Sequence, residues 1–184
     1  MRGRARGHAR AQSDEGPDAD PLEVTREMAL RRLEQRDYSR GELSDYLVRR
    51  RGADPEIVEA VLARLEGVGL VDDARFAASW VDSRRRTRQL SRRALAQELR
   101  AKHVDTQLID AVLDAGDQEE ERELALAACR TRALRLHGVD REVAFRRLAG
   151  ALARKGFPSS TVVSVVKQVL DEMPDADGED DNGA

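Results

Sequence analysis

The residues of this chain that are best suited to chemistry are arginines, which are concentrated between Arg84 and Lys102. This stretch of 19 residues carries eight bases and a single acid, Glu98. An arginine guanidinium can donate two parallel hydrogen bonds to a carboxylate or a phosphate, so the stretch suits a polyanion or an acidic protein groove. Its candidate contact residues are Arg84, Arg85, Arg86, Arg88, Arg92, Arg93, Arg100 and Lys102.

A helix is expected to begin near Ser91 and to expose part of this stretch. On that helix Leu95 and Leu99 share one face, whereas Arg93 and Arg100 lie roughly opposite. The excess of seven positive charges is more than solubility requires, which favours a binding role. The alternative, a solvated face in an arginine-rich protein with 29 Arg and 3 Lys, stays open.

A second group of bases surrounds the apolar residues Phe145, Leu148 and Leu152. Its candidate contact residues are Arg146, Arg147, Arg154 and Lys155. Bases near the end of a helix also stabilise its macrodipole, so a structural role and a binding role explain this group equally well. The run from Arg49 to Arg51 fits the structural role better.

No arrangement of residues typical of catalysis occurs in the sequence. The adjacent acids Asp72 and Asp73 directly precede a predicted helix, and we favour a capping role for them over a metal site or an acid–base pair. Cys129 is the single cysteine, which excludes an internal disulfide and a cysteine-built zinc site. The three histidines, His8, His103 and His137, lie in unrelated contexts. We therefore predict that the protein is not an enzyme and needs no metal or cofactor.

The composition predicts an all-α fold. Ala, Leu, Arg and Glu dominate the 184 residues, aromatics make up 3%, and β-branched residues cluster only from Val162 to Val169. Charged residues make up 36%, and no apolar stretch approaches the roughly 20 residues that a membrane-spanning helix needs. The basic start of the chain lacks the apolar run of a secretory signal. We therefore expect a soluble cytoplasmic protein that makes no membrane contact.

The net charge of −3 conceals an uneven distribution of charge. Residues 24–170 carry 28 bases against 23 acids, whereas residues 171–184 carry seven acids and no base. Apolar residues are scarce at both ends, so burial there cannot offset the entropy lost on ordering. We predict a disordered arm over residues 1–22 and a disordered acidic tail over residues 172–184.

Between the two ends, apolar residues recur at helical spacing and predict nine helices. Local signals mark some of the helix ends. Ser39 and Glu42 form a predicted capping box, Gly52 suits the residue after a helix, and Pro55 suits the first turn of the next helix.

An internal repeat of 51 to 53 residues divides these helices. The positions that match are Leu43, Leu47, Gly52, Ile57, Val61 and Leu62, then Leu95, Leu99, His103, Leu108, Val112 and Leu113, and then Leu148, Leu152, Gly156, Thr161, Val165 and Val166. We predict three tandem three-helix repeats, over residues 23–71, 72–116 and 117–171, that form an elongated, curved helical array. Stacking would complete the small core of each repeat.

One segment of the chain resembles the signature of the RecX family. It runs Gly69-Leu70-Val71-Asp72-Asp73-Ala74-Arg75-Phe76-Ala77, with Trp80-Val81-Asp82-Ser83-Arg84 behind it, and weaker likenesses extend the resemblance over about residues 26–170. We assign structural roles to the signature residues Gly69, Leu70, Asp72, Asp73, Arg75, Phe76, Ala77 and Trp80. The sequence departs from the family at Leu90-Ser91, where a Gly-Pro-like turn is common, and at His103, which replaces the usual glycine.

The resemblance implies three tandem three-helix repeats and a regulator that binds along the filament that the RecA recombinase forms on DNA. Such a regulator inhibits ATP hydrolysis, strand exchange and coprotease activity, and so modulates DNA repair, recombination and the SOS response. The implied partners are RecA and single- or double-stranded DNA, bound without sequence preference, and we expect a monomer. The assignment of the two basic groups as the contact surface is our own inference, because the family signature fixes fold residues more firmly than contact residues.

Two other functions fit the same residues. One is direct DNA binding by three-helix units that act like helix-turn-helix modules, although the sequence shows no base-reading motif and few aromatics for stacking. The other is a structural adaptor for a different acidic protein. A direct DNA binder loses affinity along a straight log–log line with salt, with or without RecA, whereas an adaptor does not bind the filament at all.

Overall fold

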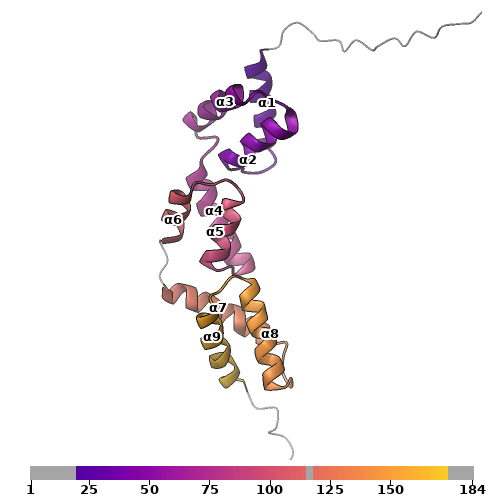
Figure 1. Cartoon of the computed structure of the whole chain (residues 1–184), viewed down its shortest axis with the longest axis vertical. Helices are drawn as coiled ribbons and strands as arrows, with labels where there is room; N and C mark the ends of the chain where they lie inside the picture. Colours follow the sequence, from indigo (N-terminus) through magenta and orange to yellow (C-terminus); the bar gives the residue numbers. More distant parts are fainter. Residues whose placement is uncertain (1–19, 115–117, 174–184) are drawn as a thin grey trace, which may run out of the picture.

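The computed structural model describes residues 20–114 and 118–173, and every regular element within these ranges is a helix. The elements are α1 (Pro21–Leu33), α2 (Arg40–Asp45), the π-helical turn η1 (Tyr46–Arg50), α3 (Pro55–Gly67), α4 (Asp73–Arg88), α5 (Arg92–Arg100), α6 (Thr106–Asp114), α7 (Gln118–Ala133), α8 (Arg141–Arg154) and α9 (Ser159–Asp171). Figure 1 shows an elongated stack, with α1 to α3 at the top and α7 to α9 at the bottom. The all-α prediction is confirmed, and the described ranges hold the predicted nine α-helices. Of the residues predicted to be disordered, 1–22 and 172–184, residues 1–19 and 174–184 lie outside the described residues. The predicted boundary of the arm is wrong, because α1 begins at Pro21, where Asp20 caps its first turn.

The start of α2 shows how the helix ends are stabilised. The hydroxyl of Ser39 accepts a hydrogen bond from Glu42 N (3.1 Å), as a capping residue should. The predicted capping box is only half formed, because the Glu42 carboxylate accepts stronger charge-assisted bonds from Arg36 and Lys102 instead of turning back to Ser39. After η1, Gly52 adopts the left-handed conformation (φ 72°) that was expected of it.

Each group of three helices has its own cluster of buried apolar residues. The clusters include Leu43, Leu47 and Leu62 in α1 to α3, Leu95, Leu99 and Ile109 in α4 to α6, and Leu148, Leu152 and Val166 in α7 to α9. Leu43, Leu95 and Leu148, which the repeat aligns, are each completely buried. The repeat therefore matches core positions, while the number of repeats and their boundaries remain predictions.

The three groups are joined where the start of one helix meets the end of another. In the first junction the N-terminus of α2 meets the end of α5, and the Ser39 hydroxyl donates a hydrogen bond to the carbonyl of Lys102. In the second junction the N-terminus of α5 meets the end of α8, and Ser91 N donates to the carbonyl of Lys155 (3.0 Å). Because a helix start is partially positive and a helix end partially negative, both contacts are electrostatically favourable.

An acid from the following group also caps each of these helix starts. Arg40 N, at the start of α2, donates to Asp73 Oδ1 of α4 (2.7 Å). Arg92 N, at the start of α5, donates to Glu121 Oε1 of α7 (3.1 Å). Burial raises the pKa of Asp73 above its ordinary value, although the Arg40 N–H favours the charged carboxylate. Since Arg40 and Arg92 are equivalent in the repeat, the two junctions are built in the same way.

A glycine allows the two helices to pack closely at each junction, but it belongs to the helix start in the first junction and follows the helix end in the second. In the first, Gly41 of α2 faces His103, which keeps the left-handed conformation of the usual glycine (φ 59°). In the second, Gly156 (φ 88°) faces Ser91 and Ala94 of the α5 start. The departure from the family pattern at His103 is thus accommodated because Gly41 leaves room for its side chain.

Gly156→Ala should destabilise the protein by about 2–5 kcal/mol, because it adds a side chain to a left-handed residue and overpacks the second junction. A methyl group there would lie 2.5 Å from Ser91 Oγ and 2.8 Å from Ala94 Cβ. Gly138→Ala is the matched control, since Gly138 has φ 70° and open space around it, and should cost about 1–2 kcal/mol. Urea unfolding followed by circular dichroism measures both changes, and equal losses would contradict tight packing at Gly156.

Candidate functional site

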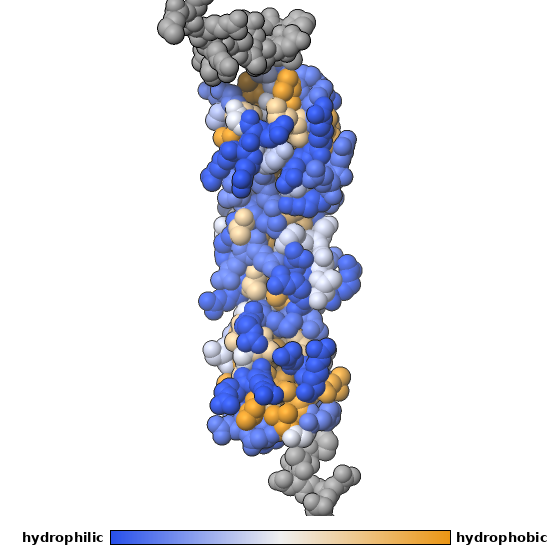
Figure 2. Space-filling view, turned by 90° about the vertical axis from the view of Figure 1, so that its right-hand side faces the viewer, coloured by the Kyte–Doolittle hydropathy of each residue, from blue (hydrophilic) through white to orange (hydrophobic). Residues whose placement is uncertain are grey.

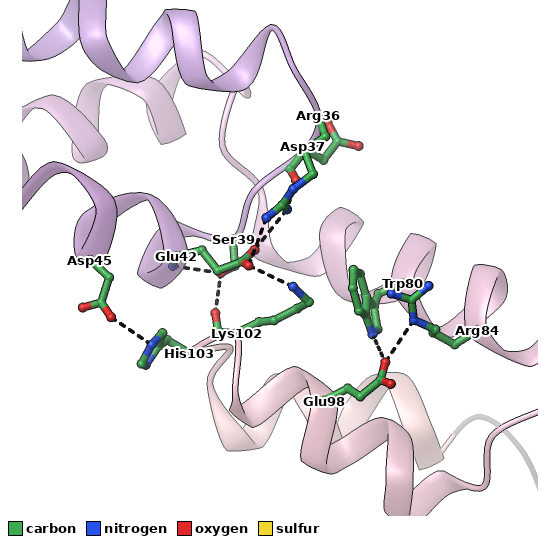
Figure 3. Close-up of polar contacts among 10 residues, drawn as sticks. All are labelled: Arg36, Asp37, Ser39, Glu42, Asp45, Trp80, Arg84, Glu98, Lys102 and His103. Atoms are coloured by element: carbon green, nitrogen blue, oxygen red, sulfur yellow. Dashed lines mark hydrogen bonds and ion pairs between the residues drawn. The ribbon is translucent and has the colours of Figure 1, made fainter. Parts of the chain in front are cut away.

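Three side chains of α4 converge on Glu98 of α5, the single acid of the basic stretch. Arg84 Nε and Trp80 Nε1 donate hydrogen bonds to Glu98 Oε2 at 3.0 and 2.9 Å, and Arg88 donates to Oε1 at 2.8 Å. Figure 3 shows Trp80 and Arg84 meeting this carboxylate. These bonds hold α4 and α5 together and neutralise Arg84 and Arg88, two of the eight candidate bases of the stretch.

The indole ring of Trp80 contacts two cations. The Arg84 guanidinium lies 3.9 Å from the ring centroid and the Lys102 ammonium 4.0 Å from it, distances at which cation–π attraction is effective. The ring of Phe76, which is buried, stacks on Trp80 with centroids 5.8 Å apart. Arg84 and Lys102 therefore help to cover the edge of the second core.

Lys102 also completes the first junction. Its ammonium donates to Glu42 Oε1 (2.8 Å), and Arg36 donates to both carboxylate oxygens of Glu42 (3.2 and 3.3 Å), as Figure 3 shows. Burial alone would raise the pKa of Glu42, but the hydrogen bonds from Arg36 and Lys102 outweigh it and hold the pKa below its ordinary value. The Lys102 side chain is 16% exposed, so this residue, expected on an open basic surface, lies inside the junction.

The remaining bases of the stretch include four arginines with no ion pair to another described residue. Arg86, Arg93 and Arg100 are exposed and Arg85 is partly buried. Arg93 and Arg100 lie two turns apart on α5 and project from the same side. Arg92 differs from them, because it forms an ion pair with Asp114 (2.7 Å).

The second basic group likewise contains bases without an ion pair and a base that is used within the fold. Arg146, Arg147 and Arg154 of α8 are exposed and make no ion pair with another residue of the described ranges. Lys155 is partly buried in the second junction, where its ammonium donates to the carbonyl of Arg88.

Figure 2 shows a mostly hydrophilic face, with apolar residues gathered over the lowest helix group.

The signature segment connects the first and second helix groups. Asp72 caps its own helix by accepting a hydrogen bond from Arg75 N (2.9 Å), whereas Asp73 reaches back to the start of α2. Capping is therefore confirmed for both acids, with the correction that Asp73 caps a different helix. The Arg75 guanidinium donates to the carbonyl of Gly69 (3.0 Å), which holds the left-handed turn (φ 71°) before α4. The other members of the segment are Leu70, which is exposed, and Ala77, which is completely buried.

Cys129 is not placed for reactivity. It is buried among the helices of the third group, and burial raises the pKa of its thiol to about 11, which keeps it protonated at neutral pH. Among the described residues no three metal-ligating side chains of the His, Cys, Asp and Glu types come together. No described helix is long and apolar enough to cross a membrane.

A cavity of about 470 Å³ opens beside the second junction, between the end of α4, α7 and α8. Its lining includes five bases and no acid: Arg88, Arg132, Arg135, Arg154 and Lys155. Arg132 and Arg135 were not among the predicted contact residues. Their spacing of one helical turn at a helix end is common for structural reasons, so the sequence offered only a weak signal.

Comparison with known proteins shows a consistent likeness. Sequence models of RecX, for its first and its second three-helix domain, match residues 26–65 and 72–113. Regulatory protein RecX of Streptomyces lividans is 45% identical over 180 residues, which cover 97% of this chain and 92% of that protein. Regulatory protein RecX of Thermobifida fusca is 42% identical, over 79% of this chain and 78% of that protein.

Solved structures resemble the chain in fold. The crystal structure of RecX from Lactobacillus salivarius superposes with a TM-score of 0.70 at 18% identity, over 82% of this chain and 97% of that one. A crystal structure of another regulatory protein RecX has a TM-score of 0.68 at 26% identity, over 81% of this chain and 72% of that one. The end-to-end stack of helix groups therefore has counterparts among solved proteins.

Glu42→Gln should destabilise the protein by about 1–3 kcal/mol at neutral pH, because it removes the charge that joins Arg36 and Lys102. The pKa of Glu42 is lowered in the folded state, so its contribution is complete above the ordinary pKa of glutamate and is lost as the pH falls through the lowered value. Unfolding in urea over a series from pH 7 to pH 2 tests this, with the difference between variant and parent largest at pH 7 and shrinking as the pH falls below the ordinary pKa of glutamate. Glu27→Gln, in an exposed pair with Arg31, should change little at any pH of the series, and an equal effect there would contradict the special role of Glu42.

Proposed function

The chain belongs to the RecX family of regulatory proteins, and we propose that it binds the RecA nucleoprotein filament and inhibits ATP hydrolysis, strand exchange and coprotease activity. Through this inhibition it modulates recombination, DNA repair and the SOS response. We further propose that it acts in the cytoplasm as a monomer and without enzymatic activity of its own.

The proposed contact surface consists of the predicted contact arginines that form no ion pair within the fold. The observation that carries this proposal is that, of these candidates, four arginines of the second group and three of the third make no ion pair with another described residue. They are Arg85, Arg86, Arg93, Arg100, Arg146, Arg147 and Arg154. Guanidinium groups without internal partners can bind phosphates or carboxylates of a partner without first breaking a bond. The elongated stack in Figure 1 suits a partner that offers such acceptors repeatedly along its length.

The other candidate bases have structural roles in this proposal. Arg84 and Arg88 hold Glu98, Arg92 pairs with Asp114, and Lys102 and Lys155 lie in the two junctions. Replacing these five would change stability as well as binding, so they are poor probes of contact.

The direct test is the ATPase activity of RecA on single-stranded DNA with substoichiometric amounts of this protein. A progressive fall in the rate of ATP hydrolysis is expected. An unchanged rate with the purified protein in excess would contradict the proposal.

The variant Arg86→Ala/Arg93→Ala/Arg100→Ala should raise the concentration needed for half-inhibition by about tenfold or more. Its stability should change little, because exposed side chains without ion pairs contribute little to folding. The matched control is Arg49→Ala/Arg50→Ala/Arg51→Ala, which removes the same charge from the first helix group. Equal loss of inhibition in both variants would show that only net charge matters.

Direct DNA binding is the second candidate function, and the same unpaired arginines favour it. Its distinguishing property is a linear fall of log affinity with log salt concentration, whose slope counts the phosphates contacted. If DNA affinity without RecA accounts for all of the inhibition, this second function replaces the first.

A further inference from the structure

The first junction shows a carboxylate held between two cations. Glu42, the third residue of α2, accepts hydrogen bonds from Arg36 at 3.2 Å and from Lys102 at 2.8 Å. Arg36 precedes the capping residue Ser39 by three positions, and Lys102 supplies the carbonyl that Ser39 binds. The cations therefore have fixed positions relative to the junction.

The second junction has the same two cations but no acid at the position of Glu42, and Arg88 pairs instead with Glu98 of α5 (2.8 Å). Arg88 precedes the capping residue Ser91 by three positions, and Lys155 supplies the carbonyl that Ser91 N binds. The third residue of α5, which corresponds to Glu42, is Ala94. Lys155 donates to the carbonyl of Arg88, and no carboxylate of a described residue pairs with it.

Positive charge accumulates in the cavity beside this junction, where Lys155 has no carboxylate partner among the described residues. The cavity of about 470 Å³ beside the junction is lined by Arg88 and Lys155, and also by Arg132, Arg135 and Arg154, which have no ion pair with another described residue. Burial and the nearby charge of Arg88 both lower the pKa of Lys155, whose ammonium contacts a carbonyl and no carboxylate of a described residue. An oxyanion placed here would relieve repulsion among several cations.

The walls of the cavity favour one class of ligand. Between the basic side chains the lining has apolar residues, Leu90, Leu148, Ala151 and Leu152, beside the polar Gln89 and Thr131, so a short aliphatic group can lie beside the anion. No aromatic residue lines it on which a nucleobase could stack. The group that pairs with the equivalent lysine in the first junction, Glu42, is a carboxylate. A protein segment with acidic and aliphatic side chains fits these features better than a nucleic acid strand.

We propose that the cavity at the second junction binds an acidic segment of another protein, whose carboxylate pairs with Lys155 as Glu42 pairs with Lys102 in the first junction. A neighbouring aliphatic side chain of that segment lies on the apolar wall. Binding joins α4 to α7 and α8 and so holds the second and third helix groups together. This inference is independent of which protein the chain regulates.

The experiment supplies the missing carboxylate from within the chain. Binding of a fluorescein-labelled peptide of alternating glutamate and leucine is measured by fluorescence anisotropy at low salt, with the full chain. Ala94→Glu should weaken binding by about tenfold or more, because its carboxylate pairs with Lys155, whereas the isosteric and neutral Ala94→Gln should weaken it less than about twofold. Ala94→Glu should also raise the melting temperature above that of Ala94→Gln.

A second variant makes the test independent of the fit of a new side chain at position 94. Arg132→Ala/Arg135→Ala removes two exposed cations of the cavity and should also weaken binding by about tenfold, whereas Arg49→Ala/Arg50→Ala, with the same change of charge, should not. A peptide with serine in place of leucine should bind more weakly than the original. Failure of the labelled peptide to bind, or equal affinity for Ala94→Glu and Ala94→Gln together with no loss in Arg132→Ala/Arg135→Ala, would overturn the proposal. Preferential binding of a labelled oligothymidylate that depends on Arg132 and Arg135 would overturn it in favour of a nucleic acid site.

Discussion

The arrangement of this protein depends on how two buried helix starts, those of α2 and α5, obtain partners for their polar groups. Each apolar cluster belongs to one helix group, so the polar contacts at the two junctions determine how the groups stack. The Ser39 hydroxyl and the Ser91 backbone N–H each donate to a carbonyl at the end of a helix in the next group. The carboxylates of Asp73 and Glu121 accept hydrogen bonds from the backbone N–H groups of the first residues of α2 and α5. The chain thereby satisfies groups that a helix cannot satisfy by itself.

In this arrangement the signature residues together form the connection between the first and second helix groups. Asp72 starts α4, Asp73 caps α2, and Arg75 fixes the turn at Gly69, so one short segment both ends one helix group and begins the next. Phe76 then anchors α4 in the second core, next to Trp80, which the cations Arg84 and Lys102 cover. The segment connects the two groups, and the contacts of Asp72, Asp73, Arg75 and Phe76 all lie within the fold.

The same constraint divides the positive charge of the protein into two classes. Lys102, Lys155 and the two arginines that hold Glu98 are used internally, whereas the exposed arginines of α5 and α8, such as Arg93 and Arg146, are not. The two junctions also differ, because Glu42 pairs with both cations of the first, whereas in the second Arg88 pairs with Glu98 and Ala94 leaves Lys155 without an acid. A repeated fold can in this way keep one site closed for stability and leave its counterpart open for a ligand.

The sequence by itself determined the helical fold, the capping residues and the periodic core positions such as Leu43, Leu95 and Leu148, because these depend on local spacing and on a pattern that the chain repeats. It also located the basic stretch and the family signature. Only the tertiary structure decided which bases are free, because the pairs of Glu98 with Arg84 and of Glu42 with Lys102 join residues 14 and 60 positions apart. The inclusion of Arg132 and Arg135 in a cavity beside Lys155 was likewise decided by tertiary packing, since it requires α7 and α8 to meet the end of α4.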